Sequence, residues 1–90
     1  MKIRNVIVQC AQGLHLRVAS QVSKIAQQSG TSVHIRCEGC PQADACSVLQ
    51  LLTLGAGAGT ALEIEAVGAD EKEAAVLRAL ADLFEQGGGI

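Results

Sequence analysis

The 90-residue sequence predicts a single α+β domain, a two-layer open-faced sandwich of a four-stranded antiparallel sheet with three helices on one face. Apolar residues recur at helical spacing in residues 16–28, in a short run at 47–54 and in residues 70–84. Short β-branched or alternating runs occupy residues 2–9, 31–37 and 61–67, and residues 41–43 are a candidate fourth strand. Each helix has one apolar stripe and each strand one apolar face, so we expect the two layers to bury each other.

The first half of the chain is predicted to form a strand, a helix and a second strand. Residues 2–9 are short and β-branched, which favours a strand. The predicted helix over residues 16–28 has its apolar stripe at Val18, Val22, Ile25 and Ala26. Residues 31–37 alternate, which places His34 and Arg36 on the open face of the sheet. Three residues of this strand should face the helices: Val33, Ile35 and Cys37.

The second half continues with an edge strand, a short helix, a strand and a last helix. Residues 41–43 suit an edge strand, where the proline does least harm. The short helix is expected to begin at Asp44 or Ala45 and to end before Gly55. Residues 61–67 alternate, with Leu62, Ile64 and Ala66 inward and Glu63 and Glu65 outward.

The last helix has a predicted start and a predicted buried stripe. Asp70 is the expected N-cap, and Glu73 is expected to reach back in a reciprocal capping arrangement. The buried stripe is predicted to contain Ala74, Leu77, Leu80, Ala81 and Phe84.

Composition and charge exclude several classes of function. The chain has one Phe and no Tyr or Trp, so it lacks the aromatic surfaces that stack on single-stranded nucleic acid. A net charge of −2 also argues against binding a phosphate backbone. No apolar run suits direct membrane insertion and no signal segment opens the chain, so a cytoplasmic protein is expected. The glycine-rich residues 55–60 lack the Gly-Lys-Ser/Thr of a P-loop.

A histidine stands where the first strand passes into the first helix. Gly13 permits a sharp turn, and His15 then lies at the helix start, where backbone N–H groups have no internal partner. Such a helix end attracts anions. Arg17 adds a guanidinium whose donors suit phosphate oxygens. The pattern indicates a histidine that can hold a phosphoryl group; an ordinary helix cap is the alternative.

Four cysteines need a separate interpretation: Cys10, Cys37, Cys40 and Cys46. In a cytoplasmic protein the sequence favours thiols or metal ligands over structural disulfides. Cys37 and Cys40 have the Cys-x-x-Cys spacing of metal and redox sites, but a second pair at matching spacing is missing. Three interpretations stay open: isolated thiols, a zinc or iron–sulfur site built from the four cysteines, and a redox pair of Cys37 and Cys40.

Two motifs resemble the HPr family, the histidine-containing phosphocarrier proteins of the phosphoenolpyruvate-dependent sugar phosphotransferase system. Residues 13–19 read Gly-Leu-His-Leu-Arg-Val-Ala and are similar to the family's Gly-Ile/Leu-His-Ala-Arg-Pro-Ala. Residues 47–55 read Ser-Val-Leu-Gln-Leu-Leu-Thr-Leu-Gly and are similar to the family's Ser-Ile-Met-Gly-Leu-Met-Ser-Leu. The predicted order of strands and helices is also that of the family, and the resemblance covers nearly the whole chain.

The resemblance implies a monomeric phosphocarrier that needs no cofactor and is not a stand-alone enzyme. His15 would accept a phosphoryl group on Nδ1 from enzyme I, which obtains it from phosphoenolpyruvate, and would pass it to an enzyme IIA domain or a regulatory target. Arg17 and the backbone amides of Leu16 and Arg17 would bind the phosphate. Ser47 matches the serine that a dedicated kinase phosphorylates in some members of the family. A phosphorylase would remove this phosphate again. The partner-docking surface would include Val48, Leu49 and Leu51 or Leu52.

The chain departs from the family pattern in three respects. Val18 replaces a proline, which adds an N–H and should leave the helix start intact but the His15 loop looser. Cys46 stands where many members that receive serine phosphorylation have a basic residue. The four cysteines have no counterpart in the family pattern. These departures motivate an alternative function, a regulatory HPr-like binding protein with a cysteine-ligated zinc or iron–sulfur site.

Overall fold

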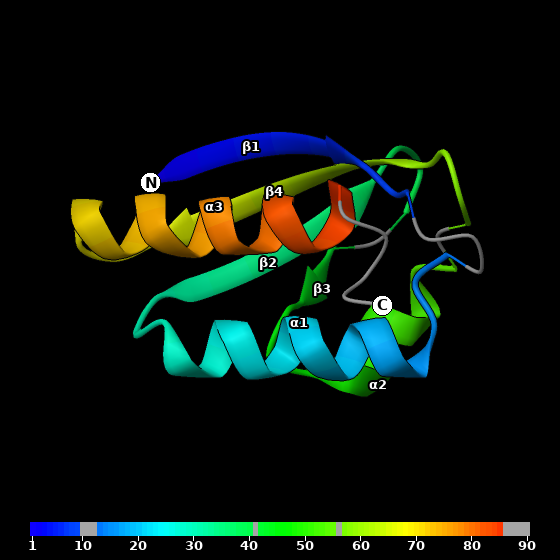
Figure 1. Ribbon diagram of the computed structural model, residues 1–90, viewed down its shortest axis with the longest axis horizontal. Helices are drawn as coiled ribbons and strands as arrows, with labels where there is room; N and C mark the ends of the chain where they lie inside the picture. The colour runs from blue at the N-terminus through cyan, green and yellow to red at the C-terminus, as the bar shows by residue number, and fades with distance from the viewer. Residues whose placement is uncertain (10–12, 41, 56, 86–90) are drawn as a thin grey trace.

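A computed structural model of the chain describes residues 1–9, 13–40, 42–55 and 57–85 and has the predicted two-layer architecture (Figure 1). The elements are β1 (Lys2–Ile7), α1 (Leu16–Gln28), β2 (Ser32–Cys37), β3 (Ala43–Asp44), α2 (Val48–Thr53), β4 (Ala61–Val67) and α3 (Asp70–Glu85). The four strands form one antiparallel sheet in the order β1-β4-β2-β3. α1 and α3 lie on the same face of this sheet and run in opposite directions (Figure 1). The predicted fold class is confirmed.

The core lies between the sheet and the helices. The predicted inward residues of β2 and β4 are all buried: Val33, Ile35, Cys37, Leu62, Ile64 and Ala66. From the helices, the buried apolar residues include Val18, Val22, Ala26, Leu77, Leu80 and Phe84. On the open face Arg36 lies opposite Glu63 in the ladder and forms an ion pair with it. In the described part of the chain, no helix is long and apolar enough to cross a membrane.

The short helix starts later than predicted. It begins at Val48, with Ser47 as its N-cap, so a start at Asp44 or Ala45 is wrong. The sheet takes up those two residues instead, because Asp44 pairs with His34 and the Ala45 amide donates to the Val33 carbonyl at 2.9 Å. The edge strand accordingly covers Ala43–Asp44 rather than residues 41–43, of which Pro41 lies outside the described residues.

The last helix differs from its prediction in two features, its N-cap and one residue of its buried stripe, and each lies one position earlier than predicted. The amide of Glu73 donates to the Ala69 carbonyl at 2.8 Å, which makes Ala69, not Asp70, the N-cap. Ala74 is exposed rather than buried, and Glu73 occupies the inward position with 1% of its surface exposed. Glu73, Leu77, Leu80 and Phe84 continue one helical stripe at spacings of four, three and four, which Ala74 does not join.

The buried Glu73 carboxylate closes the start of α3. Its Oε2 accepts a hydrogen bond from the Gly68 amide at 2.8 Å and lies 3.0 Å from the amino group of Met1. The carboxylate reaches back as predicted, but to Gly68, the residue before the Ala69 cap, so the reciprocal arrangement with Asp70 is wrong. The hydrogen bond from Gly68 holds the pKa of the Glu73 carboxyl below its ordinary value, and the Met1 amino group lowers it further, against the opposing effect of burial.

Replacing Glu73 with glutamine should weaken the acid dependence of stability. A carboxyl whose pKa is lower in the folded state stabilises the protein at neutral pH, and this contribution is lost as the pH falls from about 5 through the folded-state pKa. Urea unfolding at pH 7 and pH 3 should therefore show a smaller loss for Glu73→Gln than for the native chain. The exposed Glu71→Gln should keep the native dependence. An unchanged acid dependence in Glu73→Gln would contradict this role of Glu73.

Candidate functional site

The segment that leads from β1 to α1 is anchored on both sides of residues 10–12, which lie outside the described part of the chain. Before them, the Gln9 amide donates to the Phe84 carbonyl at 3.2 Å. After them, Gly13 adopts a φ of 72°, a left-handed conformation that glycine reaches without strain, so the predicted sharp turn is confirmed. Leu14 is buried, and the His15 amide donates to the Gly13 carbonyl at 3.0 Å. The backbone thus enters α1 in a defined direction.

His15 is the N-cap of α1. Its backbone is extended (φ −95°, ψ 178°), and its carbonyl accepts the first helical hydrogen bond from the Ala19 amide at 2.8 Å. Its side chain is half-buried, and Nδ1 accepts a long hydrogen bond of 3.3 Å from the Arg17 amide. In the neutral ring, this geometry places the lone pair on Nδ1 and the proton on Nε2. Nδ1 therefore faces the first turn of α1.

The start of α1 is unoccupied by acidic groups. No Asp or Glu lies in its first turn, whereas the first turn of α3 contains three: Asp70, Glu71 and Glu73. Within the described ranges, the amides of Leu16 and Val18 have no hydrogen-bond acceptor. The Arg17 amide donates to His15 Nδ1, and near α3 the Gly68 amide, which precedes the helix, donates to the Glu73 carboxylate. A helix start with such amides and no acidic side chain is suited to an external anion.

Arg17 adds the only positive side chain in the first turn of α1. The side chain is exposed, and the described part of the chain offers it no ion-pair or hydrogen-bond partner. A guanidinium free to turn toward an anion can bind two phosphate oxygens at once. Together, the Nδ1 lone pair, the amides and Arg17 provide a nucleophile beside donors for the oxygens of a transferred phosphoryl group.

The second sequence motif forms α2, which packs against α1. α1 and α2 are packed together, and the end of α2 and the start of α1 lie at the same end of the molecule (Figure 1). Ser47 is the N-cap of α2, with Oγ accepting from the Gln50 amide at 3.3 Å. A cap in this position stabilises the first turn of a short helix.

Apolar side chains are exposed on both of these helices. Leu49 is 77% exposed and Leu16 is 62% exposed, while Val48 and Leu52 are half-buried. Leu51 is fully buried, so its prediction as a docking residue is wrong: it packs into the core and cannot contact a partner. The side chain of Leu16 was not among the predicted docking residues. Leu16 lies four residues before Ser20 and eight before Lys24, both exposed, so it shares the polar face of α1 with them. This spacing could have indicated that the Leu16 side chain is exposed.

The structure joins two of the four cysteines. Cys37 and Cys40 form a disulfide, so the expectation of thiols or metal ligands is wrong for this pair in the form observed. Cys46 is a half-buried thiol whose pKa is raised by burial and by the neighbouring Asp44 carboxylate, and Cys10 lies outside the described residues. No group of three or more His, Cys, Asp or Glu in the described ranges could hold a metal ion. A zinc or iron–sulfur site stays a prediction for the reduced protein, because disulfide sulfurs are not thiolate ligands.

Comparison with known proteins decides the family. A family model described as "PTS HPr component phosphorylation site" matches residues 2–86. The chain belongs to the HPr family of phosphocarrier proteins. It is 34% identical over 84 residues to the phosphocarrier protein NPr of Proteus mirabilis, covering 93% of this chain and 91% of NPr. It is 37% identical over 72 residues to the phosphocarrier protein HPr of Neisseria meningitidis, covering 80% of this chain and 78% of that protein.

The fold agrees with this family. The crystal structure of HPr-C-His from Thermoanaerobacter tengcongensis superposes with a TM-score of 0.89 at 26% identity, over 100% of this chain and 98% of that one. Within this HPr fold, Val18 in place of proline leaves α1 starting at Leu16, as expected. The looser loop expected from Val18 falls in part on residues 10–12, outside the described residues.

Proposed function

We propose that this HPr-family protein carries a phosphoryl group on Nδ1 of His15, accepting it from enzyme I and passing it to an enzyme IIA domain or a regulatory target. The observation that supports this most directly is the Nδ1 lone pair at a helix start without acidic residues. In the transfer, the bond from Nδ1 to phosphorus forms as the donor's bond to phosphorus breaks. The phosphoryl oxygens then replace Nδ1 as acceptors of the amide donors at the helix start.

The carrier role needs moderate stabilisation of the phosphorylated form. The group must be passed on, so the donors at His15 should hold it without trapping it. Exposed Arg17 and solvent-facing amides suit this, because charge–charge interactions are weaker in water than in a buried site. The partners supply most of the positioning that phosphoryl transfer requires. The protein is accordingly a substrate of other enzymes in the phosphotransferase system.

Incubation with enzyme I and phosphoenolpyruvate tests this function. The intact protein should gain the mass of one phosphate, and the gain should disappear after mild acid treatment, because phosphohistidine is labile to acid. A known HPr labelled in parallel shows that the donors are active. If that protein is labelled and this one is not, the proposed function is wrong.

Replacing Arg17 with alanine should slow phosphoryl acceptance by about tenfold, because a charge-assisted contact to the transferred group is lost. Arg17→Lys should recover part of the rate through its charge, without bidentate contacts. The initial rate of phosphohistidine formation at limiting enzyme I measures both. Arg78→Ala, which removes an exposed arginine on α3, is the matched control and should keep the native rate. Equal rates for Arg17→Ala and the control would contradict this role of Arg17.

Partners are proposed to dock on the surface formed by Leu16, Val48, Leu49 and Leu52, beside His15. The docking is expected to be transient and to bury less than about 1,200 Å² in total, as weak encounters do.

We propose that the carrier is a cytoplasmic monomer. Phosphorylation of Ser47 by a serine kinase stays a prediction; it would put negative charge at the start of α2, within this surface.

A further inference from the structure

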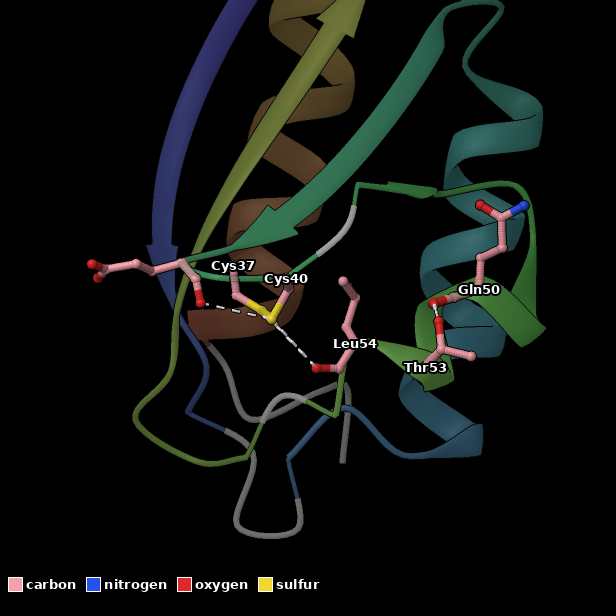
Figure 2. The surroundings of a disulfide bond; sticks show 6 residues. Cys37, Cys40, Gln50, Thr53 and Leu54 are labelled. Carbon is pink, nitrogen blue, oxygen red and sulfur yellow. Dashed lines mark hydrogen bonds between the residues drawn. A yellow bond between two sulfur atoms is a disulfide. The ribbon is translucent and has the colours of Figure 1, made fainter.

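A disulfide-bonded turn touches the end of α2. Figure 2 shows the Cys37–Cys40 disulfide facing Leu54, the residue that closes this helix. The Leu54 carbonyl oxygen lies 3.8 Å from Cys40 Sγ and 4.0 Å from Cys37 Sγ. Leu54 is itself buried, and the backbone leaves the helix at Gly55 with a φ of 63°. The turn and the end of α2 are therefore in direct contact.

The turn is built to bring the two sulfurs together. It follows β2, the Cys40 amide donates to the Cys37 carbonyl at 3.1 Å, and Gly39 has a φ of 77°. A positive φ at this third position, with no positive φ at Glu38, defines a type II turn, which favours glycine there. Cys37 is 9% exposed and Cys40 is half-buried, so Cys40 is the sulfur that a solution thiol reaches more easily.

The redox state of Cys37 and Cys40 changes the contacts of the Leu54 carbonyl oxygen. Disulfide sulfurs carry no hydrogen, so in the oxidised form they contact the Leu54 carbonyl without donating to it. Reduction gives two thiols whose sulfurs are no longer bonded and must therefore move apart. At most one of them can then donate a weak S–H hydrogen bond to the Leu54 carbonyl. Reduction also removes a covalent closure of a short loop, and this loss is the larger effect on the order of the turn.

We propose that Cys37 and Cys40 are a reversible dithiol–disulfide site for a dithiol reductant, and that its redox state changes the order of the end of α2. A thiolate of the reductant attacks Cys40 Sγ, the Cys37–Cys40 bond breaks, and Cys37 leaves as a thiolate that takes a proton from water. The reductant's second thiolate then attacks its own sulfur in the mixed disulfide and releases Cys40. The site gains two electrons and two protons, and the dithiol becomes a disulfide.

The consequence for phosphoryl transfer rests on the proposed function. α2 supplies three of the four docking residues, and its end lies at the same end of the molecule as the start of α1 (Figure 1). The amides of Leu54 and Gly55 donate to Leu51 and Leu52 at 3.2 and 3.3 Å, the last hydrogen bonds of the helix. A looser turn should let this end fray and reduce the order of the docking surface. Disulfides in the cytoplasm are usually transient, catalytic or sensing, which suits a switch at this place.

Hydrogen exchange in the two redox states tests the proposal without any partner. The full chain is treated with dithiothreitol or left oxidised, and alkylation with mass mapping of the peptides identifies the reduced cysteines. Reduction should expose Cys37 and Cys40 to alkylation in the folded protein. It should also raise exchange at the Leu54 and Gly55 amides by at least about threefold, while the Glu73 amide in α3 stays unchanged.

Two variants separate the site from a general thiol effect. Cys46→Ser keeps the disulfide and should show the same redox response as the native chain. Cys37→Ser with Cys40→Ser should exchange like the reduced native chain in both buffers. Should the double variant not fold, the two forms of the native chain still give the comparison.

The outcomes distinguish this proposal from the phosphocarrier function. A disulfide that dithiothreitol does not reduce in the folded protein overturns the redox site, and equal exchange at Leu54 and Gly55 in both forms overturns the coupling to α2. With enzyme I and phosphoenolpyruvate, the reduced form should be phosphorylated at least about twofold more slowly than the oxidised form. Equal rates overturn the functional consequence alone. Absence of labelling in both forms counts against the proposed function, but the conclusion on the redox site and α2 still follows from hydrogen exchange.

Discussion

Replacing His15 with alanine should abolish phosphoryl acceptance, the largest effect of any substitution considered. Alanine removes the nitrogen to which the phosphoryl group would be attached, so no slower route through the same site remains. The amides at the start of α1 and the Arg17 guanidinium would still attract an anion, but they offer no nucleophile. Labelling with enzyme I and phosphoenolpyruvate, read by intact mass, should show less than about one-thousandth of the native rate, which is the scale lost with an essential nucleophile.

His34 is the matched control, because it is the other histidine in the chain. It lies on the open face of the sheet, opposite Glu65 in β4 and Asp44 in β3, whereas His15 lies at the start of α1. His34→Ala should therefore be labelled at the native rate. If labelling survives in His15→Ala but is lost in His34→Ala, the phosphoryl acceptor is His34 on the face of the sheet, and the role proposed for His15 is wrong.

Replacing Phe84 with alanine should be the most destabilising change in the core. Phe84 is fully buried in α3, and it is the only aromatic residue in the chain. Deleting a buried phenylalanine side chain costs about 3–5 kcal/mol of unfolding free energy, out of a total of about 5–15 kcal/mol for a domain of ordinary stability. Urea unfolding should show this loss. The Gln9 amide also binds the Phe84 carbonyl, so the segment that leads to His15 should lose order as well.

Leu49→Ala is the comparison for this effect, because it also truncates a large apolar side chain. Leu49 is 77% exposed, so its loss should change the unfolding free energy by no more than about 0.5 kcal/mol. The same variant should be phosphorylated more slowly if Leu49 contacts enzyme I. A Phe84→Ala variant as stable as Leu49→Ala would contradict the place of Phe84 in the core.

Much of the fold could be predicted because its patterns are local. The helix over residues 16–28 and the strand over residues 61–67 have the predicted bounds, since hydrophobic period and turn residues agree in both. The helix start at His15 could also be predicted, because Gly13 and the first apolar residues of α1 are adjacent in sequence. These features depend on neighbours a few residues away.

The features that could not be predicted depend on contacts between distant parts of the chain. Asp44 joins the sheet because β2 lies beside it, although its sequence also suits the start of a helix. Leu51 is buried because α2 packs against α1, and a six-residue helix shows too little of a period to indicate which leucine faces inward. Glu73 is buried because the Gly68 amide and the Met1 amino group both reach it. None of these partners is visible in a hydrophobic pattern.

The disulfide shows a further limit. Cys-x-x-Cys spacing is compatible with a metal site, a thiol pair and a disulfide, and the choice depends on the turn that joins the two residues. The type II turn at Gly39 brings the sulfurs together. Glycine after Glu38 favours a turn by its residue type, but residue types do not give the direction of the two cysteine side chains.

Nuclear magnetic resonance of the phosphorylated protein tests the central claim most directly. Protein labelled with ¹⁵N is kept phosphorylated by enzyme I and phosphoenolpyruvate while imidazole and amide nitrogens are recorded. We predict coupling to phosphorus at Nδ1 of His15, with the largest amide shifts at Leu16, Arg17 and Val18. Coupling at Nε2 of His15 or at His34, or amide shifts confined to other parts of the chain, would contradict a phosphoryl group held at the start of α1.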